Sequence, residues 1–190
     1  MASARPRRGV YPGSFDPLTV AHVAIAEAAI SQLGLDRLDF ALSRSAFDKE
    51  HLDDSLEQRR AALRRYADHR GTAARPGTRP GDPGAGVTGL GRVEVVVVDA
   101  RLIAEVARGY DAVVMGADKW YQLHELRFYD HDPRARDRAL ASLPRVAVAP
   151  RDGWTVPEQH RLHLPAEFGE VSATAVRQGR HEWRAGHASD

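Results

Sequence analysis

Residues 11–22 combine a glycine, a threonine and a histidine in a pattern that suits phosphate binding. Gly13 lies in a predicted turn, and Thr19 and His22 stand where an amphipathic helix over 21–33 is predicted to begin. Free backbone N–H groups and a positive dipole end make a helix N-terminus attractive to anions. We expect Thr19 to cap this helix and His22 to point a ring nitrogen at the anion. A simple turn followed by a partly exposed helical histidine fits the same residues.

Residues 171–177 place two hydroxyl groups and a guanidinium around a second predicted helix start. Ser172 and Thr174 can donate to phosphate oxygens, and Arg177 can offer a charged fork to the same group. This combination predicts a clamp for a polyphosphate. The alternative interpretation is an N-cap serine with an arginine at the surface.

A third segment follows the strand predicted over 112–115. Gly116 lets a ligand approach the backbone closely, and Asp118 can accept hydrogen bonds from hydroxyl groups or cap the next helix. No set of histidines and carboxylates has the spacing of metal ligands, so we expect no metal site built by the protein itself.

Alternating strand and helix patterns must position these segments. Apolar runs predict strands over 9–11, 38–42, 93–98, 112–115, 145–149 and 162–164. Helical patterns predict helices over 21–33 (ending at Gly34), from the capping pair Ser55 and Gln58, over 100–108, over 118–129 and from 172. The valine-rich run at 93–98 is typical of a strand buried on both faces of a parallel sheet. These units predict an α/β fold, an open doubly wound parallel sheet of the Rossmann-like type, with ligands beyond the carboxyl ends of the strands.

The composition is that of a globular protein with no dominant charge. The 190 residues carry a net charge of +1, and no apolar run approaches the roughly 20 residues that span a bilayer. The balanced charge and the 7% aromatic content argue against a nucleic-acid partner. The absence of cysteine excludes disulfides and thiolate metal sites, and no apolar signal segment follows the basic N-terminus. We therefore expect a cytoplasmic protein with neither a nucleic-acid nor a membrane partner.

The predicted organisation is a basic, mobile leader at 1–7 followed by a single domain over 8–190. Residues 71–92 contain seven glycines and three prolines and almost no large apolar side chain. Such a segment buries too little apolar surface to offset the entropy of ordering it, so we expect a flexible insertion within the domain. The sequence leaves the oligomeric state open, a homo-oligomer included.

The two phosphate-binding segments resemble the two signatures of the nucleotidylyltransferase superfamily. Residues 13–22 are similar to G-x-F-D-P-x-[HT]-x-G-H, and residues 171–177 to I-S-S-T-x-x-R, in the order and at about the distance that the family requires. The resemblance covers residues 9 to about 180. It implies attack by a phosphate-bearing substrate on the α-phosphorus of ATP or CTP. Mg²⁺ would assist, pyrophosphate would leave, and no covalent enzyme intermediate would form.

The resemblance also implies roles for individual residues. His22 would contact the α-phosphate as charge builds up in the transition state, and Thr19 stands where many members carry another histidine. Lys49 occupies about the place of a lysine that holds the phosphate of the second substrate, although a solvated loop lysine is the alternative. With Arg177, these residues are the expected catalytic set. The further ATP-binding positions would be Gly13, Ser14, Phe15, Gly116, Asp118, Ser172 and Thr174.

One segment bears on the second substrate. Residues 116–118, with His124 six residues beyond Asp118, resemble the G-A-D…H segment of nicotinate- and nicotinamide-mononucleotide adenylyltransferases. Leu126 stands where those enzymes commonly carry a tryptophan that stacks on the pyridine ring, and Trp120 and Tyr121 are candidate replacements. With His124 they form the expected substrate site. We therefore favour a mononucleotide of nicotinate or nicotinamide, in NAD biosynthesis, as the second substrate.

Other functions stay open on particular residues. Thr19 in the first signature is the form typical of pantetheine-phosphate adenylyltransferases, and a cytidylyltransferase-like enzyme is a further alternative. Ala21 replaces the glycine before the final histidine, and Ala173 replaces the second serine of the second signature. These two replacements leave room for a diverged nucleotide-binding member without activity.

Overall fold

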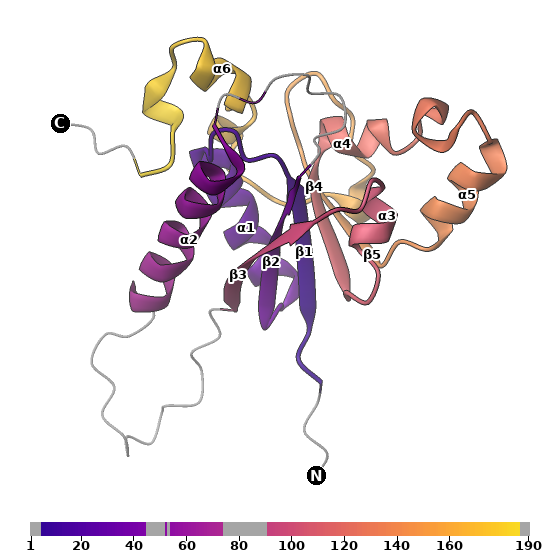
Figure 1. The fold of residues 1–190 in the computed structure, drawn as a ribbon, viewed down its shortest axis with the longest axis horizontal. Helices are drawn as coiled ribbons and strands as arrows, with labels where there is room; N and C mark the ends of the chain where they lie inside the picture. Colours follow the sequence, from indigo (N-terminus) through magenta and orange to yellow (C-terminus); the bar gives the residue numbers. More distant parts are fainter. Residues whose placement is uncertain (1–4, 45–51, 53, 74–90, 187–190) are drawn as a thin grey trace.

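Five parallel strands form a single sheet (Figure 1). The computed structural model describes residues 5–44, 52, 54–73 and 91–186. The strands are β1 (Arg8–Gly13), β2 (Arg37–Ser43), β3 (Arg92–Val98), β4 (Ala112–Gly116) and β5 (Arg145–Ala149). Their order is β3-β2-β1-β4-β5, so the order reverses between β1 and β4. The α/β parallel sheet predicted from the sequence is confirmed, and its switch point lies between β1 and β4.

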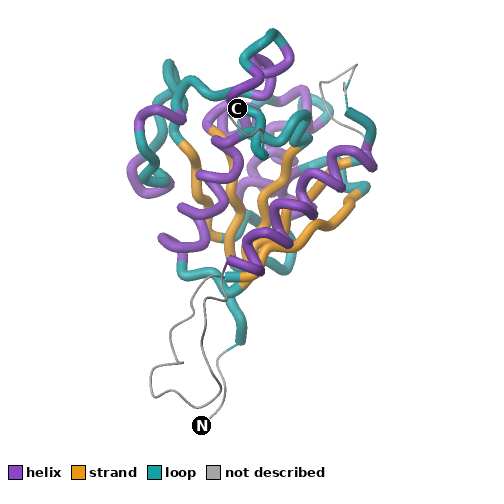
Figure 2. Tube along the Cα trace, turned by 90° about the vertical axis from the view of Figure 1, so that its left-hand side faces the viewer, coloured by secondary structure: helices purple, strands orange, loops and turns teal. Residues whose placement is uncertain are grey.

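Helices cover both faces of this sheet (Figures 1 and 2). One face carries α1 (Val20–Leu33) and α2 (Leu56–Ala73), and the other carries α3 (Ile103–Val106), α4 (Ala117–Gln122) and α5 (Pro133–Ala141). The C-terminal region adds α6 (Ala173–Arg177). Successive side chains of a strand point to opposite faces, so Tyr11 of β1 packs in the core under α1 and Val10 packs in the core under α3 and α4.

Local signals determine where the first two helices begin. The hydroxyl of Thr19 accepts the backbone N–H of His22, and Gly34 ends α1 with φ 61°, in the left-handed region that glycine adopts freely. At the start of α2, the N–H of Ser55 donates to the Gln58 side chain at 2.7 Å, and the N–H of Gln58 donates to Ser55 Oγ at 3.2 Å. The predictions of both helix starts are confirmed.

The helix predicted over 118–129 is divided in the structure. α4 ends at Gln122, the backbone of Glu125 is extended, and a 3-10 helix, η1 (Leu126–Tyr129), follows. The next helix, α5, lies outside the predicted elements. The side chain of Asp132 caps it by accepting the N–H of Arg134 at 2.8 Å, with proline at the first helical position. The Asp-Pro pair is therefore the local signal that marks this helix.

Three further predictions differ from the structure. β3 is an edge strand whose valines are half-buried, because only one side of it has a neighbouring strand. The strand predicted over 162–164 is reduced to one bridge between Arg161 and Val148. The helix predicted over 100–108 extends only from Ile103 to Val106. An apolar pattern in the sequence indicates that a segment is buried, but it does not indicate which elements lie beside that segment.

The predicted leader and insertion fall partly within the described residues. Arg5 donates to Asp111, and the backbone N–H of Arg7 donates to Asp36 at 2.7 Å. Residues 1–4, and 74–90 of the insertion predicted over 71–92, lie outside the described part. In the portion of the chain that the structure describes, no helix is long and apolar enough to cross a membrane.

A buried carboxylate on β2 binds arginines at the amino ends of β1 and β2. Asp39 of β2 is fully buried and accepts hydrogen bonds from Arg37 Nε at 2.5 Å, Tyr110 at 2.8 Å and Arg8 Nη2 at 3.3 Å. Burial by itself would raise the pKa of Asp39, but these hydrogen bonds and the charge of Arg37 outweigh it and hold the pKa below its usual value. The ionised carboxylate is therefore the form that the fold favours.

We expect Asp39→Asn to lower the free energy of unfolding at neutral pH by about 2–3 kcal/mol, because the arginines lose a charged partner. The pKa of Asp39 is lower in the folded state than the unfolded value of about 3.9. The contribution of ionised Asp39 to the free energy of unfolding is therefore complete at pH values above its pKa in the unfolded state. That contribution is lost as the pH falls through its pKa in the folded state. Urea unfolding measures the difference in the free energy of unfolding between wild type and Asp39→Asn, and this difference should become smaller as the pH is lowered. The exposed control Asp137→Asn should change little, and an Asp39→Asn difference that stays constant with pH would contradict the prediction.

Candidate active site

The loops after β1 and β4 come together at the carboxyl end of the sheet, where the strand order reverses. Figure 1 shows α4 and α6 at this same end of the molecule. A Cβ on Gly13 would lie 2.7 Å from the ring of Phe15, and a Cβ on Gly116 would lie 2.7 Å from Asp118 Oδ1. Each glycine therefore leaves space for a side chain two residues further along that folds back over the strand end.

The contact between Thr19 and His22 determines the tautomer of the imidazole. The backbone N–H of Thr19 donates to His22 Nδ1 at 3.1 Å, and the Thr19 hydroxyl lies 2.9 Å from the same atom. A ring nitrogen that accepts a hydrogen bond carries no proton, so neutral His22 carries its proton on Nε2. Nε2 is thus a donor, as a phosphate oxygen requires. Thr19 is 1% exposed, and its hydroxyl serves the helix cap and the imidazole, so Thr19 positions His22.

Aromatic rings surround the imidazole and restrict its motion. The ring of Phe15 lies edge-on to His22 with centroids 5.1 Å apart, and the ring of Tyr11 lies 6.2 Å away. Burial and the nearby carboxylate of Asp118 both raise the pKa of Tyr11 well above its usual value. Gly9 and Val10 of β1 pair with Ala112 and Val113 of β4, so the segments that follow these two strands leave the sheet next to each other at the switch point.

Arg177 joins α6 to the loop after β1. Its Nη1 donates to the carbonyl oxygen of Asp16 and lies 3.7 Å from the Asp16 carboxylate, and its Nη2 donates to the hydroxyl of Thr174 at 3.1 Å. Ser172 Oγ accepts the N–H of Ala175 at 3.0 Å, so the N-cap interpretation of this serine is confirmed. Residues separated by 161 positions in the sequence are thus in direct contact.

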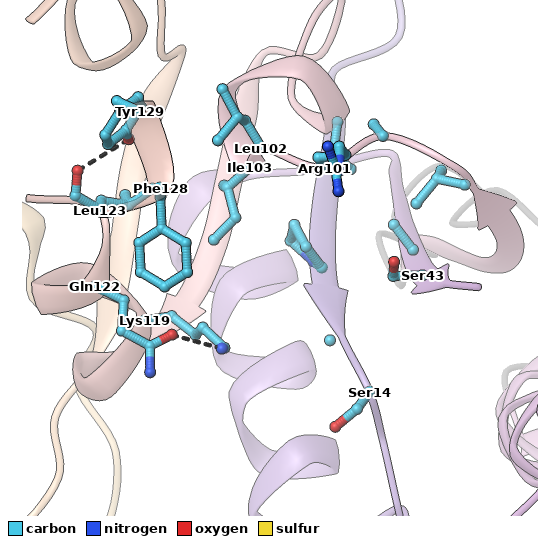
Figure 3. Close-up of a pocket in the computed structure, with 16 residues that line it drawn as sticks. Ser14, Ser43, Arg101, Leu102, Ile103, Lys119, Gln122, Leu123, Phe128 and Tyr129 are labelled. Atoms are coloured by element: carbon cyan, nitrogen blue, oxygen red, sulfur yellow. Dashed lines mark hydrogen bonds between the residues drawn. The ribbon is translucent and has the colours of Figure 1, made fainter. Parts of the chain in front are cut away.

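A pocket of about 130 Å³ lies on the α3 and α4 face at the same end of the sheet (Figure 3). Its walls are mainly apolar and include Ala41, Val98, Leu102, Ile103, Val106, Leu123 and Phe128. Among the described lining residues, the charged side chains are Arg101 and Lys119, and Lys119 Nζ donates to Gln122 at 2.6 Å. Pro12, Gly13 and Ser14 form the wall toward β1. The end of β1 therefore separates this pocket from His22.

The substrate residues expected from the sequence lie outside the lining of this pocket. Trp120 packs against the rings of His124 and His160, each with centroids 4.9 Å away. Tyr121 packs against Trp154 with centroids 4.8 Å apart and donates to the carbonyl of Thr155 at 2.8 Å. The side chains of α4 that do line the pocket are Lys119, Gln122 and the cap residue Leu123. The orientation of this short helix decides which of its residues reach the pocket.

Sequence reasoning missed the aromatic wall of the pocket, Phe128. It lies two residues beyond Leu126, and the break in the predicted helix at Glu125 turns it into the pocket. An aromatic residue this near the expected tryptophan position was the available signal. Lys49, expected to hold a phosphate, lies outside the described residues. Ala21 is 6% exposed, so its methyl group faces the protein interior.

Comparison with known proteins agrees with this architecture. The chain is 27% identical to a protein named probable nicotinate-nucleotide adenylyltransferase from Bordetella pertussis, over 97% of this chain and 89% of that protein. It is 26% identical to the protein of the same name from Bordetella parapertussis, over 90% of this chain and 84% of that protein.

Solved structures share the fold. Plasmodium falciparum nicotinic acid mononucleotide adenylyltransferase complexed with NaAD superimposes with a TM-score of 0.58 at 13% identity, covering 92% of this chain and 83% of that one. Its complex with APC gives a TM-score of 0.55 at 11% identity and the same coverage. The cytidylyltransferase-like family model matches residues 10–179. The chain therefore belongs to the cytidylyltransferase-like family and is a nucleotidyltransferase.

Proposed function

We propose that the protein transfers AMP from ATP to a pyridine mononucleotide and that nicotinate mononucleotide is the preferred acceptor. The pocket across β1 from His22 is the observation that carries the proposal. Its volume of about 130 Å³ is close to that of cavities that hold one six-membered ring, and Phe128 supplies an aromatic wall. The names of the Bordetella relatives support the same acceptor.

The charge of the pocket favours the acid over the amide. Its described lining contains the cations Arg101 and Lys119 and no carboxylate. A nicotinate ring carries a carboxylate that can bind such a cation, whereas a nicotinamide ring is neutral at that position. A flexible phosphopantetheine chain would gain less from an aromatic-walled slot than a flat ring would.

The proposed reaction needs alignment and charge stabilisation rather than proton transfer. A phosphate oxygen of the mononucleotide attacks the α-phosphorus, the bond to the bridging oxygen breaks, and its electron pair leaves with pyrophosphate. His22 would donate from Nε2 to an α-phosphate oxygen as charge develops there, next to the N-terminus of the 14-residue helix α1. Ser172, Thr174 and Arg177 would hold the β- and γ-phosphates. We infer that Mg²⁺ arrives with ATP as part of the substrate, bound to its phosphates.

Pyrophosphate release tests the proposal directly. The purified protein is assayed with ATP or CTP against nicotinate mononucleotide, nicotinamide mononucleotide and pantetheine phosphate. We expect turnover with ATP and nicotinate mononucleotide, and at least about tenfold lower kcat/KM with the amide. Faster turnover of pantetheine phosphate, or of a CTP pair, would overturn the assignment. Tight ATP binding without turnover of any acceptor would indicate a binding protein that has lost catalysis.

Lys119→Met should change the choice between acid and amide. Losing one charge-assisted hydrogen bond is worth about 1.5–3 kcal/mol, so kcat/KM for nicotinate mononucleotide should fall about 10- to 100-fold while that for nicotinamide mononucleotide changes little. The ratio of the two constants is the measurement. Arg138→Met, which removes an exposed cation of α5 outside the pocket lining, is the matched control. Equal losses of kcat/KM for both acceptors would mean that Lys119 does not bind the ring carboxylate.

A further inference from the structure

Arg59 is a buried cation beneath the loop that follows β1. The residue belongs to α2 and is only 2% exposed. Its Nη1 donates to the carbonyl oxygen of Ser14 at 2.9 Å, whereas its Nε has no hydrogen-bond partner, and no carboxylate of the described residues forms an ion pair with it. Burying an arginine with so few partners is costly. Its one described hydrogen bond acts on the loop at Ser14.

The loop that Arg59 contacts has an unfavourable backbone conformation. Phe15 has φ 48°, in the left-handed region that L-residues rarely adopt. Its side chain is 1% exposed and packs edge-on to Tyr11 and Phe40, with centroids 5.2 and 5.0 Å away. Such a conformation persists only where neighbouring contacts hold it.

Two arginines from distant helices hold alternate carbonyl groups of this loop. Arg59 of α2 binds the carbonyl of Ser14, and Arg177 of α6 binds that of Asp16, on either side of Phe15. In a trans peptide the C=O and the N–H point in opposite directions, so the Ser14–Phe15 peptide cannot turn while Arg59 holds its oxygen. With that oxygen directed at α2, the N–H of Phe15 is directed away from α2. The orientation of a loop N–H is thus determined by a side chain outside the loop.

We propose that Arg59 is a positioning residue for nucleotide binding: it fixes the Ser14–Phe15 peptide so that the loop after β1 is already arranged for the phosphates. The proposal rests on the proposed function, because it assigns the loop to ATP. Arg59 itself touches no substrate. Its effect passes through Ser14 and through Phe15, whose ring packs against His22. Preorganisation of this kind lowers the reorganisation that the loop must undergo on the way to the transition state.

Arg59→Met and Arg59→Lys separate this role from a purely structural one. Methionine removes the donor and leaves an apolar chain in a buried site, so the midpoint of urea unfolding should shift little. We expect kcat to fall about 10- to 100-fold with KM for the mononucleotide unchanged within about twofold. Lysine keeps a charged donor near Ser14 and should restore at least about one third of wild-type kcat. Arg64→Met, an exposed arginine of the same helix, is the matched control and should leave kcat unchanged.

Binding of α,β-methylene ATP, measured by calorimetry, tests the inference without any acceptor. We expect wild type to bind the analogue, Arg59→Met to bind it at least about fivefold more weakly, and Arg59→Lys to recover most of the affinity. Wild type that fails to bind the analogue would overturn the proposed function. Wild type that binds while Arg59→Met binds equally well, or activity loss that follows loss of folding and is not rescued by lysine, would overturn the role of Arg59 alone.

Discussion

Replacing His22 by alanine is expected to lower kcat by about 10²- to 10³-fold, the usual loss when one preorganised transition-state donor is removed. The backbone N–H of Thr19 donates to Nδ1 at 3.1 Å and thereby places the proton on Nε2. The ring is also held by Phe15, 5.1 Å away between centroids. A donor held this firmly needs little reorganisation as charge builds up on the α-phosphate. The measurement is the steady-state rate of pyrophosphate release with ATP and nicotinate mononucleotide.

Folding should be affected far less than catalysis. His22→Ala removes the acceptor for the Thr19 N–H but keeps the Thr19 hydroxyl as the helix cap, so the free energy of unfolding should fall by about 1 kcal/mol or less. His69→Ala, an exposed histidine of α2, should leave kcat unchanged. A folded His22→Ala protein with wild-type kcat would show that another group makes the transition-state contact.

Arg177→Met is expected to lower kcat/KM for ATP by about 10- to 100-fold. A charge-assisted hydrogen bond to phosphate is worth about 1.5–3 kcal/mol, and the guanidinium supplies a fork that lysine cannot copy. The kcat/KM for ATP of Arg177→Lys should therefore lie between the values of Arg177→Met and wild type. KM for the mononucleotide should change little in either variant, because Arg177 lies beside Asp16, on the His22 side of β1. Initial rates measured at varied ATP concentration and saturating mononucleotide give kcat/KM for ATP.

The nearby Arg180 provides the control for charge alone. Its side chain is 58% exposed, and its guanidinium lies 3.7 Å from the Glu182 carboxylate and stacks on the ring of Trp183. Arg180→Met removes one positive charge close to α6 and should leave kcat/KM for ATP within about twofold, since exposed charges contribute little. Equal losses in Arg177→Met and Arg180→Met would mean that the general charge of this region, rather than the fork of Arg177, attracts the nucleotide.

Short-range patterns predicted the elements that carry the residues proposed to bind phosphate. The cap at Thr19, the glycine that ends α1 and the Ser55–Gln58 pair all act within four residues of their own helix ends, so the sequence contains them in full. The break at Glu125 and the burial of β3 at one edge depend on neighbours from other parts of the chain. A short stretch of sequence contains no information on those neighbours. The predictions of a continuous helix over 118–129 and of a fully buried strand over 93–98 were therefore wrong.

Arg59 and Phe128 show the same limit in the candidate site. Arg59 is one of five arginines of α2, and nothing in the local sequence distinguishes it from the other four, which are half-buried or exposed. Phe128 is an ordinary aromatic residue until the chain turns at Glu125 and places it across the pocket from β1. By itself the sequence determined the parallel α/β sheet, the caps and the two signature segments, because periodicity and capping are local properties. Only the tertiary structure decided which cation underlies the loop after β1 and which ring walls the pocket, because burial depends on contacts between elements far apart in the chain.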